Sequence, residues 1–312
     1  MTNRALDRYK GCLMGLAVGD ALGTTLEFKA PGSFQPVTTI TGGGPFGLKP
    51  GEWTDDTSMA LCLAKSLIDM KGFDARDQVA RYCQWAGSGY MSSTGVCFDI
   101  GMTVSSALRR FQINGEPFAG TTNPNMAGNG SLMRLAPVPM FYGHEWSSAE
   151  HFAEQSSRTT HGATTCLDAC RYFAGLVWGA LNGVDKDILL SARYSPAGDF
   201  WEKRPLCPEI SAIAEGSFKR KSPPDIRGTG YVVDCLEAAL WAFHNSSDFR
   251  NGCLKAVNLG NDADTTGAVY GQLAGAFYGH SGIPDHWSSL IKYREMLLET
   301  ASDLARAAGV EA

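Results

Sequence analysis

Two segments of the sequence place several carboxylate and hydroxyl side chains at the predicted start of a helix. The segments are GEWTDDTSMALCLAKSL, residues 51–67, and GNDADTTGAVYG, residues 260–271. In both, the oxygen-bearing residues are followed by small and apolar residues with helical spacing. One Ser, Thr, Asp or Asn side chain is enough to cap a helix start. Each segment therefore has more oxygen atoms than a cap uses.

The surplus of oxygen atoms favours a metal site slightly over double capping. Acidic residues in a first turn stabilise a helix by a few tenths to about 1 kcal/mol each, which explains one cluster better than two. Adjacent carboxylates also repel each other, and a divalent cation relieves that repulsion because hard ions take oxygen ligands. Two such ions suit the four carboxylates of Asp55, Asp56, Asp262 and Asp264. A water held between two metals is a nucleophile at neutral pH. From the residues alone, both interpretations stay open.

Two other ligand-binding motifs match the sequence only in part. The stretch that begins at Asp262 fits the first half of an EF-hand calcium loop, but Leu273 stands where the bidentate Glu belongs. Residues 42–47 match the GxGxxG dinucleotide fingerprint, but Pro45 and Pro50 stand where the helix of that motif would begin. We therefore expect neither a calcium loop nor a dinucleotide fold.

Four further sites in the sequence allow contact with an anion or a nucleoside, and each also has a structural explanation. Residues 129–131, in AGNGSLMR, are predicted to begin a helix and to offer backbone N–H groups to an anion, or simply to form a capped turn. His161 precedes another helix and is a cap-region side chain or an anion contact. Tyr231 is a core aromatic or a platform for a base. Asp99 is an N-cap or a ribose-hydroxyl acceptor. Glu27, in a loop, is by itself typical of a solvated surface.

Most of the chain has the apolar spacing of helices, and strand signals are weak. The best strand candidate is residues 37–40, and Pro- and Gly-rich breaks have the composition of loops rather than of a domain linker. We therefore expect one compact all-α domain over residues 1–312. The predicted helices are residues 6–22, 56–70, 76–86, 103–113, 149–157, 163–181, 231–243, 249–258, 265–278 and 286–307.

The first predicted helix has a stripe of glycines. Gly11, Gly15, Gly19 and Gly23 are four residues apart and share one face. A glycine inside a helix costs about 1 kcal/mol relative to alanine. Close packing against another helix would offset that cost, so we interpret the stripe as a packing seam.

Composition excludes several classes of protein. With 312 residues, 44% of them hydrophobic, the chain can bury a large core. The net charge of −5 argues against nucleic acid as a partner. No apolar run is long enough for a membrane span, and Asp20 interrupts the apolar run near the N-terminus, which argues against a signal peptide. Nine cysteines without a CxxC pair favour a reducing cytoplasm. We expect a cytoplasmic monomer.

In this order the motifs resemble those of the ADP-ribosylglycohydrolase family. The spacing and the GYVVD segment are most similar to the bacterial branch named for the dinitrogenase-reductase-activating glycohydrolase, which removes ADP-ribose from arginine. The matching motifs extend from Gly15 to Gly279 and read GLAVGDALGTTLEF, GEWTDDTSMAL, FDIGMT, AGNGSLMR, TTHGAT, GYVVDCLEAAL and NLGNDADTTGAVYGQLAGAFYG.

This resemblance implies a compact orthogonal all-α bundle with two Mg²⁺ or Mn²⁺ ions in a central cleft. The implied metal ligands are Thr54, Asp55, Asp56, Asp262, Asp264 and Thr265. The implied contacts to ADP-ribose are Asp99 and Gly101 in the pocket, Asn129, Gly130, Ser131 and His161 at the pyrophosphate, and Tyr231 on adenine. If the carboxylates bind metal, Thr266 or Asn261 remains to cap the second acidic helix.

The implied reaction removes ADP-ribose from a modified protein through an oxocarbenium-like transition state. Asp56, or Asp55 on the same turn, is the expected base for the attacking water, and Glu27 is the expected acid across the cleft. No acidic position of the pattern is missing, which argues against an inactive relative. The alternatives are serine-linked or nucleic-acid-linked ADP-ribose as substrate, and a non-catalytic ADP-ribose-binding protein.

Overall fold

The fold is all-α, as the sequence predicts. The computed structural model describes residues 4–310, and within that range only isolated β-bridges occur beside the helices. The α-helices are α1 (Arg4–Gly23), α2 (Asp55–Met70), α3 (Ala75–Ser88), α4 (Met102–Asn114), α5 (Pro137–Phe141), α6 (Trp146–Arg158), α7 (Thr164–Leu181), α8 (Lys186–Leu189), α9 (Phe200–Lys203), α10 (Pro208–Ala214), α11 (Val232–His244), α12 (Phe249–Val257), α13 (Ala263–Tyr278), α14 (Asp285–Ser288) and α15 (Arg294–Ala307). Short 3-10 helices cover Thr24–Leu26, Pro124–Met126, Ser217–Lys219 and His280–Gly282.

Nine of the ten predicted helices form with nearly the predicted bounds, and the last one was predicted wrongly. The segment 286–307 divides into α14 and α15 because Tyr293, with φ of 49°, has a left-handed backbone that a continuous helix does not allow. The expected strand at residues 37–40 is also absent. There the side-chain amide of Asn258 pairs with both backbone groups of Val37, at 2.8 and 3.0 Å, in place of a neighbouring strand.

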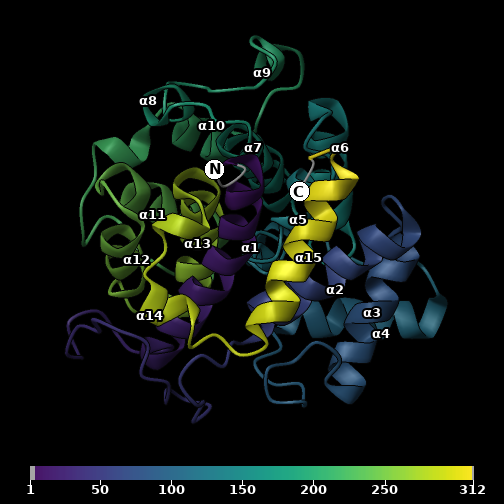
Figure 1. Cartoon of the computed structure of the whole chain (residues 1–312). Coiled ribbons are helices and arrows are strands. Elements are labelled where there is room, and N and C mark those ends of the chain that lie inside the picture. The colour runs from purple at the N-terminus through teal and green to yellow at the C-terminus, as the bar shows by residue number, and fades with distance from the viewer. Residues whose placement is uncertain (1–3, 311–312) are drawn as a thin grey trace.

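The glycine stripe of α1 packs against a second glycine stripe on α13. Gly15 faces Gly271 and Gly19 faces Gly267, so the two helices run antiparallel. A Cβ atom added at either α1 glycine would overlap the carbonyl oxygen of its partner on α13. Figure 1 shows α1 near the middle of the molecule, with α13 and α15 beside it. The interpretation of the stripe as a packing seam is confirmed.

The seam determines where the functional ends of three helices meet. At its last glycine, Gly23, the seam brings the end of α1 against the backbone of Ala263 and Asp264, at the start of α13. Helix α2 contacts both α1 and α13. One continuous cluster of buried hydrophobic side chains, from Tyr9 to Ala308, surrounds these helices. The two acidic segments therefore start from the same region of the interior.

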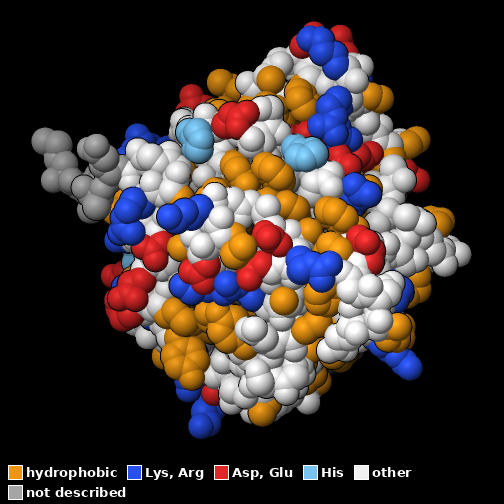
Figure 2. Space-filling model, turned by 90° about the vertical axis from the view of Figure 1, so that its right-hand side faces the viewer, with side chains coloured by type: hydrophobic (Ala, Val, Ile, Leu, Met, Phe, Trp, Pro, Cys, Tyr) orange, Lys and Arg blue, Asp and Glu red, His pale blue; other side chains and the backbone are white. Residues whose placement is uncertain are grey.

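Charged side chains of both signs are mixed on the surface of the protein (Figure 2). Figure 2 shows Lys and Arg side chains interspersed with Asp and Glu over one face, rather than gathered by sign. Among residues 4–310, no helix is both long enough and apolar enough to cross a membrane. All nine cysteines lie within this range and are unpaired.

The seam predicts a specific sensitivity to a single methyl group. We expect Gly15→Ala to lower the free energy of unfolding by about 1–3 kcal/mol, because the added Cβ forces the two helix backbones apart. Urea unfolding followed by circular dichroism measures this change. The matched control is Gly87→Ala in α3, where a Cβ meets nothing within 4 Å. That substitution should be neutral or stabilise by up to about 1 kcal/mol. Equal stability of the two variants would contradict the seam.

Candidate functional site

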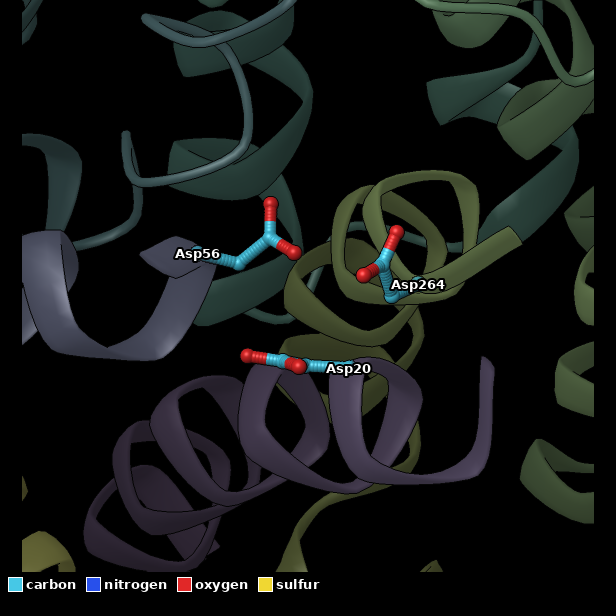
Figure 3. A group of neighbouring side chains, drawn as sticks. All are labelled: Asp20, Asp56 and Asp264. Carbon is cyan, nitrogen blue, oxygen red and sulfur yellow. The ribbon is translucent and has the colours of Figure 1, made fainter. Parts of the chain in front are cut away.

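Three buried carboxylates converge from three helices that are far apart in the sequence. Asp20 comes from α1, Asp56 from the first turn of α2 and Asp264 from the first turn of α13 (Figure 3). One carboxylate oxygen from each lies within 4.8 Å of the other two. A second group of the same kind combines Asp264 with Glu27 and Asp262. The two acidic segments recognised in the sequence therefore meet in space, and Asp264 belongs to both groups.

Asp20 caps helix α2 from outside that helix. Its Oδ1 accepts the Thr54 N–H at 2.9 Å and the Thr54 hydroxyl at 3.0 Å. Its Oδ2 accepts the Thr57 N–H at 3.1 Å and the Thr57 hydroxyl at 2.6 Å. Thr54, at the N-cap position, makes no capping bond with its own side chain. Two backbone N–H groups at the start of α2, those of Thr54 and Thr57, are thus satisfied by Asp20 rather than by Asp55 or Asp56.

Glu27 caps α13 from outside that helix in the same way. Its Oε2 accepts the Ala263 N–H at 2.9 Å, whereas the N-cap residue Asp262 makes no capping bond. The Thr266 hydroxyl donates to the Asp262 carbonyl instead, so the prediction that Thr266 or Asn261 caps this helix was wrong. Glu27 is buried, which also overturns its interpretation as a solvated loop residue. Double capping therefore does not explain the two acidic clusters.

Hydrogen bonds join the acidic helix starts to each other and to a neighbouring turn. The Thr265 hydroxyl donates to Asp56 at 3.1 Å and connects α13 with α2. The Asn129 amide donates to Asp262 at 2.9 Å. Asn129 belongs to AGNGSLMR, where residues 131–134 form a turn rather than the expected helix, and the next helix begins only at Pro137. The turn is held by the Asn129 carbonyl, which accepts the N–H groups of Leu132 and Met133.

Burial raises the pKa of every carboxyl group in this cluster for which a shift is resolved, and neighbouring carboxylates add to the rise for all of them except Asp20. Burial is the largest cause throughout, and the charge of Asp262 is the next cause for Glu27 and Asp99. The pKa rises to about 8 for Glu27, about 7 for Asp99 and about 6 for Asp20. For Asp55, Asp56 and Asp264 the pKa lies well above its ordinary value. The folded protein therefore holds its carboxylates in an environment that disfavours their charge.

One atom of this cluster lacks the partner that a buried polar atom requires. The Oδ2 atom of Asp264 is buried and accepts no hydrogen bond from any residue in the range 4–310. A buried unpaired carboxylate oxygen is costly, and a cation is the partner that also relieves the surrounding repulsion. The ligand atoms are all oxygens, which suits a hard divalent ion. The residues present therefore fit a metal ion.

A cavity of about 850 Å³ opens onto the acidic cluster. Its lining contains no Lys or Arg from the described part of the chain. Thr54 and Asp56 lie buried behind the lining, and the Ser131 side chain bonds to Ser157 at 2.8 Å in the core. The predicted site residues that line the cavity are Glu27, Asp55, Asp99, Gly101, Asn129, Gly130, His161, Asp262, Asp264 and Thr265.

Tyr231 is partly exposed, whereas His161 is buried. Tyr231 stands at the N-cap of α11 with 40% of its surface exposed, so it is not a core aromatic. It lines a hollow that shares Met102 and Gly128 with the cavity. His161 is buried, and burial lowers its pKa to about 3, with a further contribution from Arg134. Its ring is therefore neutral. Asp99 is not an N-cap, because that position of α4 belongs to Gly101.

Two residues of the site were missed by the sequence analysis. Asp20 carried a detectable signal, since a carboxylate inside a helix face of glycines and apolar residues requires buried partners. Arg134, fully buried behind residues 128–131, had no such signal because its surroundings come from distant segments.

Comparisons with known proteins agree on one family. A model of the family described as ADP-ribosylglycohydrolase matches residues 1–312. The ADP-ribosylarginine hydrolase Tri1 of Pseudomonas putida is 44% identical over 301 residues, which are 96% of this chain and 78% of that protein. The ADP-ribosyl-[dinitrogen reductase] glycohydrolase of Rhodospirillum rubrum is 32% identical over 288 residues, 91% of this chain and 90% of that protein. A solved structure described as an ADP-ribosylglycohydrolase-related protein complex has a TM-score of 0.86 and 42% identity, and covers 99% of this chain and 100% of that chain.

Removal of the external cap should loosen the start of α2. Asp20→Ala leaves two backbone N–H groups and the Thr57 hydroxyl without their acceptor, whereas the Thr54 hydroxyl keeps Asp56 at 3.1 Å, so we expect a loss of about 2–4 kcal/mol in the free energy of unfolding. Hydrogen–deuterium exchange of the peptide that covers residues 51–60 should become faster by more than the overall loss of stability explains. Asp69→Ala, at the far end of the same helix on a part-exposed ion pair, is the control and should change stability by less than about 1 kcal/mol. Unaltered exchange at residues 51–60 would refute the capping role.

Proposed function

The chain belongs to the ADP-ribosylglycohydrolase family, as its motifs predict, and is a hydrolase; from this premise we propose that it releases ADP-ribose from modified arginine side chains of proteins. The observation that carries the proposal is the cavity, which is lined by five carboxylates and, among residues 4–310, by no Lys or Arg. The names of the relatives from Pseudomonas putida and Rhodospirillum rubrum support the same bond class. The product is ADP-ribose.

The acidic cluster is proposed to hold two divalent cations, Mg²⁺ or Mn²⁺. The proposed ligands are Thr54, Asp55, Asp56, Asp262, Asp264 and Thr265. Two groups of carboxylates that share Asp264, and the unpaired Oδ2 of that residue, support this assignment. Such cations supply Lewis acidity and lower the pKa of water. Asp20 belongs to one of these groups, but both of its oxygens already accept hydrogen bonds from Thr54 and Thr57, so we assign it to holding the start of α2 rather than to the metal.

ADP-ribose is proposed to lie along the cavity with adenine at Tyr231. The half-exposed ring and the hollow beside it suit stacking on a base. The pyrophosphate would contact the turn of Asn129, Gly130 and Ser131 together with His161. Of Ser131, only the backbone N–H is available, since its hydroxyl is occupied in the core. Asp99 and Gly101 would line the pocket around the ribose.

Two aromatic rings in the cavity lining suit a cationic leaving group. Phe28 and Phe46 both line the cavity, and their ring centroids are 6.3 Å apart. Phe28 is 68% exposed and has a left-handed backbone, with φ of 61°. Aromatic faces and carboxylates both attract a planar guanidinium. The aromatic rings and carboxylates therefore favour arginine over serine as the modified residue, because a serine hydroxyl has no positive charge for them to attract.

Carboxyl groups of the cluster are proposed to act as the general acid and the general base of the reaction. Glu27, whose pKa is raised to about 8, holds a proton at neutral pH and would supply it to the departing nitrogen. Asp56, or Asp55 on the same turn, would accept the proton of the attacking water. Groups this close titrate jointly, so the acid and the base are properties of the cluster rather than of isolated side chains.

The proposal also covers the domain organisation, the compartment and the oligomeric state of the protein. One hydrophobic cluster extends along the described chain, and the family model matches residues 1–312, which supports a single domain. Nine free thiols fit a reducing compartment such as the cytoplasm. A monomer is proposed because the whole cavity is built from one chain.

The raised pKa values predict how pH and cations act on stability. Between the ordinary carboxyl pKa of about 4 and the raised values, the folded protein binds more protons than the unfolded chain. The stability of the metal-free protein should therefore fall as pH rises from about 5 through the Glu27 value of about 8. Deprotonated carboxylates bind cations, so stabilisation by Mn²⁺ should grow over the same range. Thermal unfolding at pH 5.5 and pH 8, with EDTA or MnCl₂, measures both effects. Asp264→Asn should abolish the Mn²⁺ response, and a response equal at both pH values would contradict the account.

Hydrolysis of defined linkages tests the reaction itself. Wild-type protein with saturating Mn²⁺ should release ADP-ribose from an arginine-modified protein, and Asp56→Asn and Asp264→Asn should lower kcat by at least about 10³-fold. The surface variant Asp69→Asn should keep normal turnover. Release from serine-linked or nucleic-acid-linked ADP-ribose, but not from arginine, would support the alternative substrates. Tight ADP-ribose binding without turnover on any linkage would identify a binding protein. Near-normal turnover in Asp56→Asn or Asp264→Asn would refute the proposed site.

A further inference from the structure

A buried cation lies directly behind the wall of the cavity. The Arg134 side chain is fully buried and forms no ion pair with a carboxylate in the described range. Its guanidinium donates to the Gly130 carbonyl at 2.8 Å and to the Thr160 hydroxyl at 2.7 Å. It also lies 4.5 Å from the ring centroid of Tyr82. Burial of a charge among neutral partners is costly, which suggests a role beyond packing.

The bond from Arg134 to Gly130 orients one peptide group. A trans peptide directs its C=O and its N–H to opposite sides. Because the Gly130 carbonyl faces Arg134, the N–H of the same peptide, which belongs to Ser131, points away from Arg134. That N–H has no partner among residues 4–310. Gly130 itself lines the cavity.

The bond from Arg134 to Thr160 determines which nitrogen of His161 carries the proton. Arginine only donates, so the Thr160 oxygen accepts from it, and the same hydroxyl lies 2.8 Å from His161 Nδ1. Thr160 is fully buried and has no other side-chain partner among the described residues. Its hydroxyl proton is satisfied only if it is donated to Nδ1. The neutral imidazole then carries its hydrogen on Nε2.

The Nε2 atom faces the same wall as the free peptide N–H. A Cβ atom at Gly130 would lie 3.2 Å from Nε2, and one at Gly128 would lie 3.5 Å from it, so these glycines leave room for the ring. Both glycines and His161 line the cavity. Two neutral donors, the Ser131 N–H and the His161 Nε2–H, are thus oriented by one guanidinium that does not itself line the cavity.

We propose that Arg134 is a positioning residue that, through Gly130 and Thr160, sets this wall to donate hydrogen bonds to an anion, the diphosphate of the ligand. The inference rests on the proposed function for the identity of that anion. A cavity lined by carboxylates repels phosphate oxygens, and the other His161 tautomer would add a lone pair to that repulsion. The hydrogen bonds from Arg134 to Thr160 and from Thr160 to His161 exclude the Nδ1–H tautomer. The buried positive charge of Arg134 also attracts the anion through the wall of the cavity.

The substitutions Thr160→Val and Thr160→Ser distinguish loss of the Arg134–Thr160–His161 hydrogen bonds from a general change in packing. Valine keeps the shape of threonine but removes the donor to Nδ1, and serine restores the hydroxyl. Thr159→Val is the control, since the Thr159 hydroxyl is equally buried but bonds to Ser156 and Gln78 instead. Nitrogen-15 NMR of histidine-labelled protein reports the tautomer of His161, with the signal assigned by its loss in His161→Asn. Wild-type, Thr160→Ser and Thr159→Val proteins should have the Nε2–H form, and Thr160→Val should populate both forms.

Binding measured in EDTA supplies a readout that is independent of turnover. Thr160→Val should weaken ADP-ribose binding by about 10-fold and leave adenosine binding within 2-fold, because adenosine has no diphosphate. Arg134→Lys, which cannot bridge both partners, should show the same selectivity. An Nδ1–H tautomer in wild-type protein, or an equal loss for both ligands in Thr160→Val, would overturn the proposal. Wild-type protein that binds ADP-ribose without hydrolysing arginine linkages would refute the reaction but not this inference.

Discussion

The close approach of α1 to α13 is the constraint on which the rest of the structure depends. Two stripes of glycines let the backbones of these helices touch where any side chain would overlap a carbonyl oxygen. The seam runs the length of α1 and ends where α13 begins, so the residues just before and after its last glycine lie at the start of the acidic helix. In this arrangement Asp20 reaches the start of α2 and Glu27 reaches the start of α13.

From that position, a single segment of chain caps two helices that it does not belong to. Asp20 satisfies the start of α2 and Glu27 satisfies the start of α13. Asp56 and the Oδ2 atom of Asp264 are consequently left to face the cluster, while Asp264 Oδ1 accepts the Thr265 N–H at 2.7 Å. The result is an unfavourable concentration of buried negative charge, visible in the raised pKa values, and the gain from binding cations is correspondingly large.

The cavity combines this acidic end with a wall of neutral donors. Nothing in its lining carries a positive side-chain charge among the described residues, and the one nearby guanidinium, Arg134, acts from behind through Gly130 and Thr160. The cavity therefore offers partners to an anion and to a cationic side chain. This combination agrees with the proposed ligand, in which a diphosphate is part of a group joined to a guanidine.

The sequence by itself determined the all-α class, nine of ten long helices and the family, because apolar periodicity and the order of the acidic motifs are local properties of the chain. It also identified the carboxylates at Asp55, Asp56, Asp262 and Asp264, since their excess over any capping need is visible in two short segments. Only the tertiary structure decided that Asp20 and Glu27 provide the caps, that Tyr293 divides the last predicted helix into α14 and α15, and that Arg134 lies behind His161. Those contacts join residues tens to hundreds of positions apart, and their geometry depends on a helix seam whose partner no local pattern could specify.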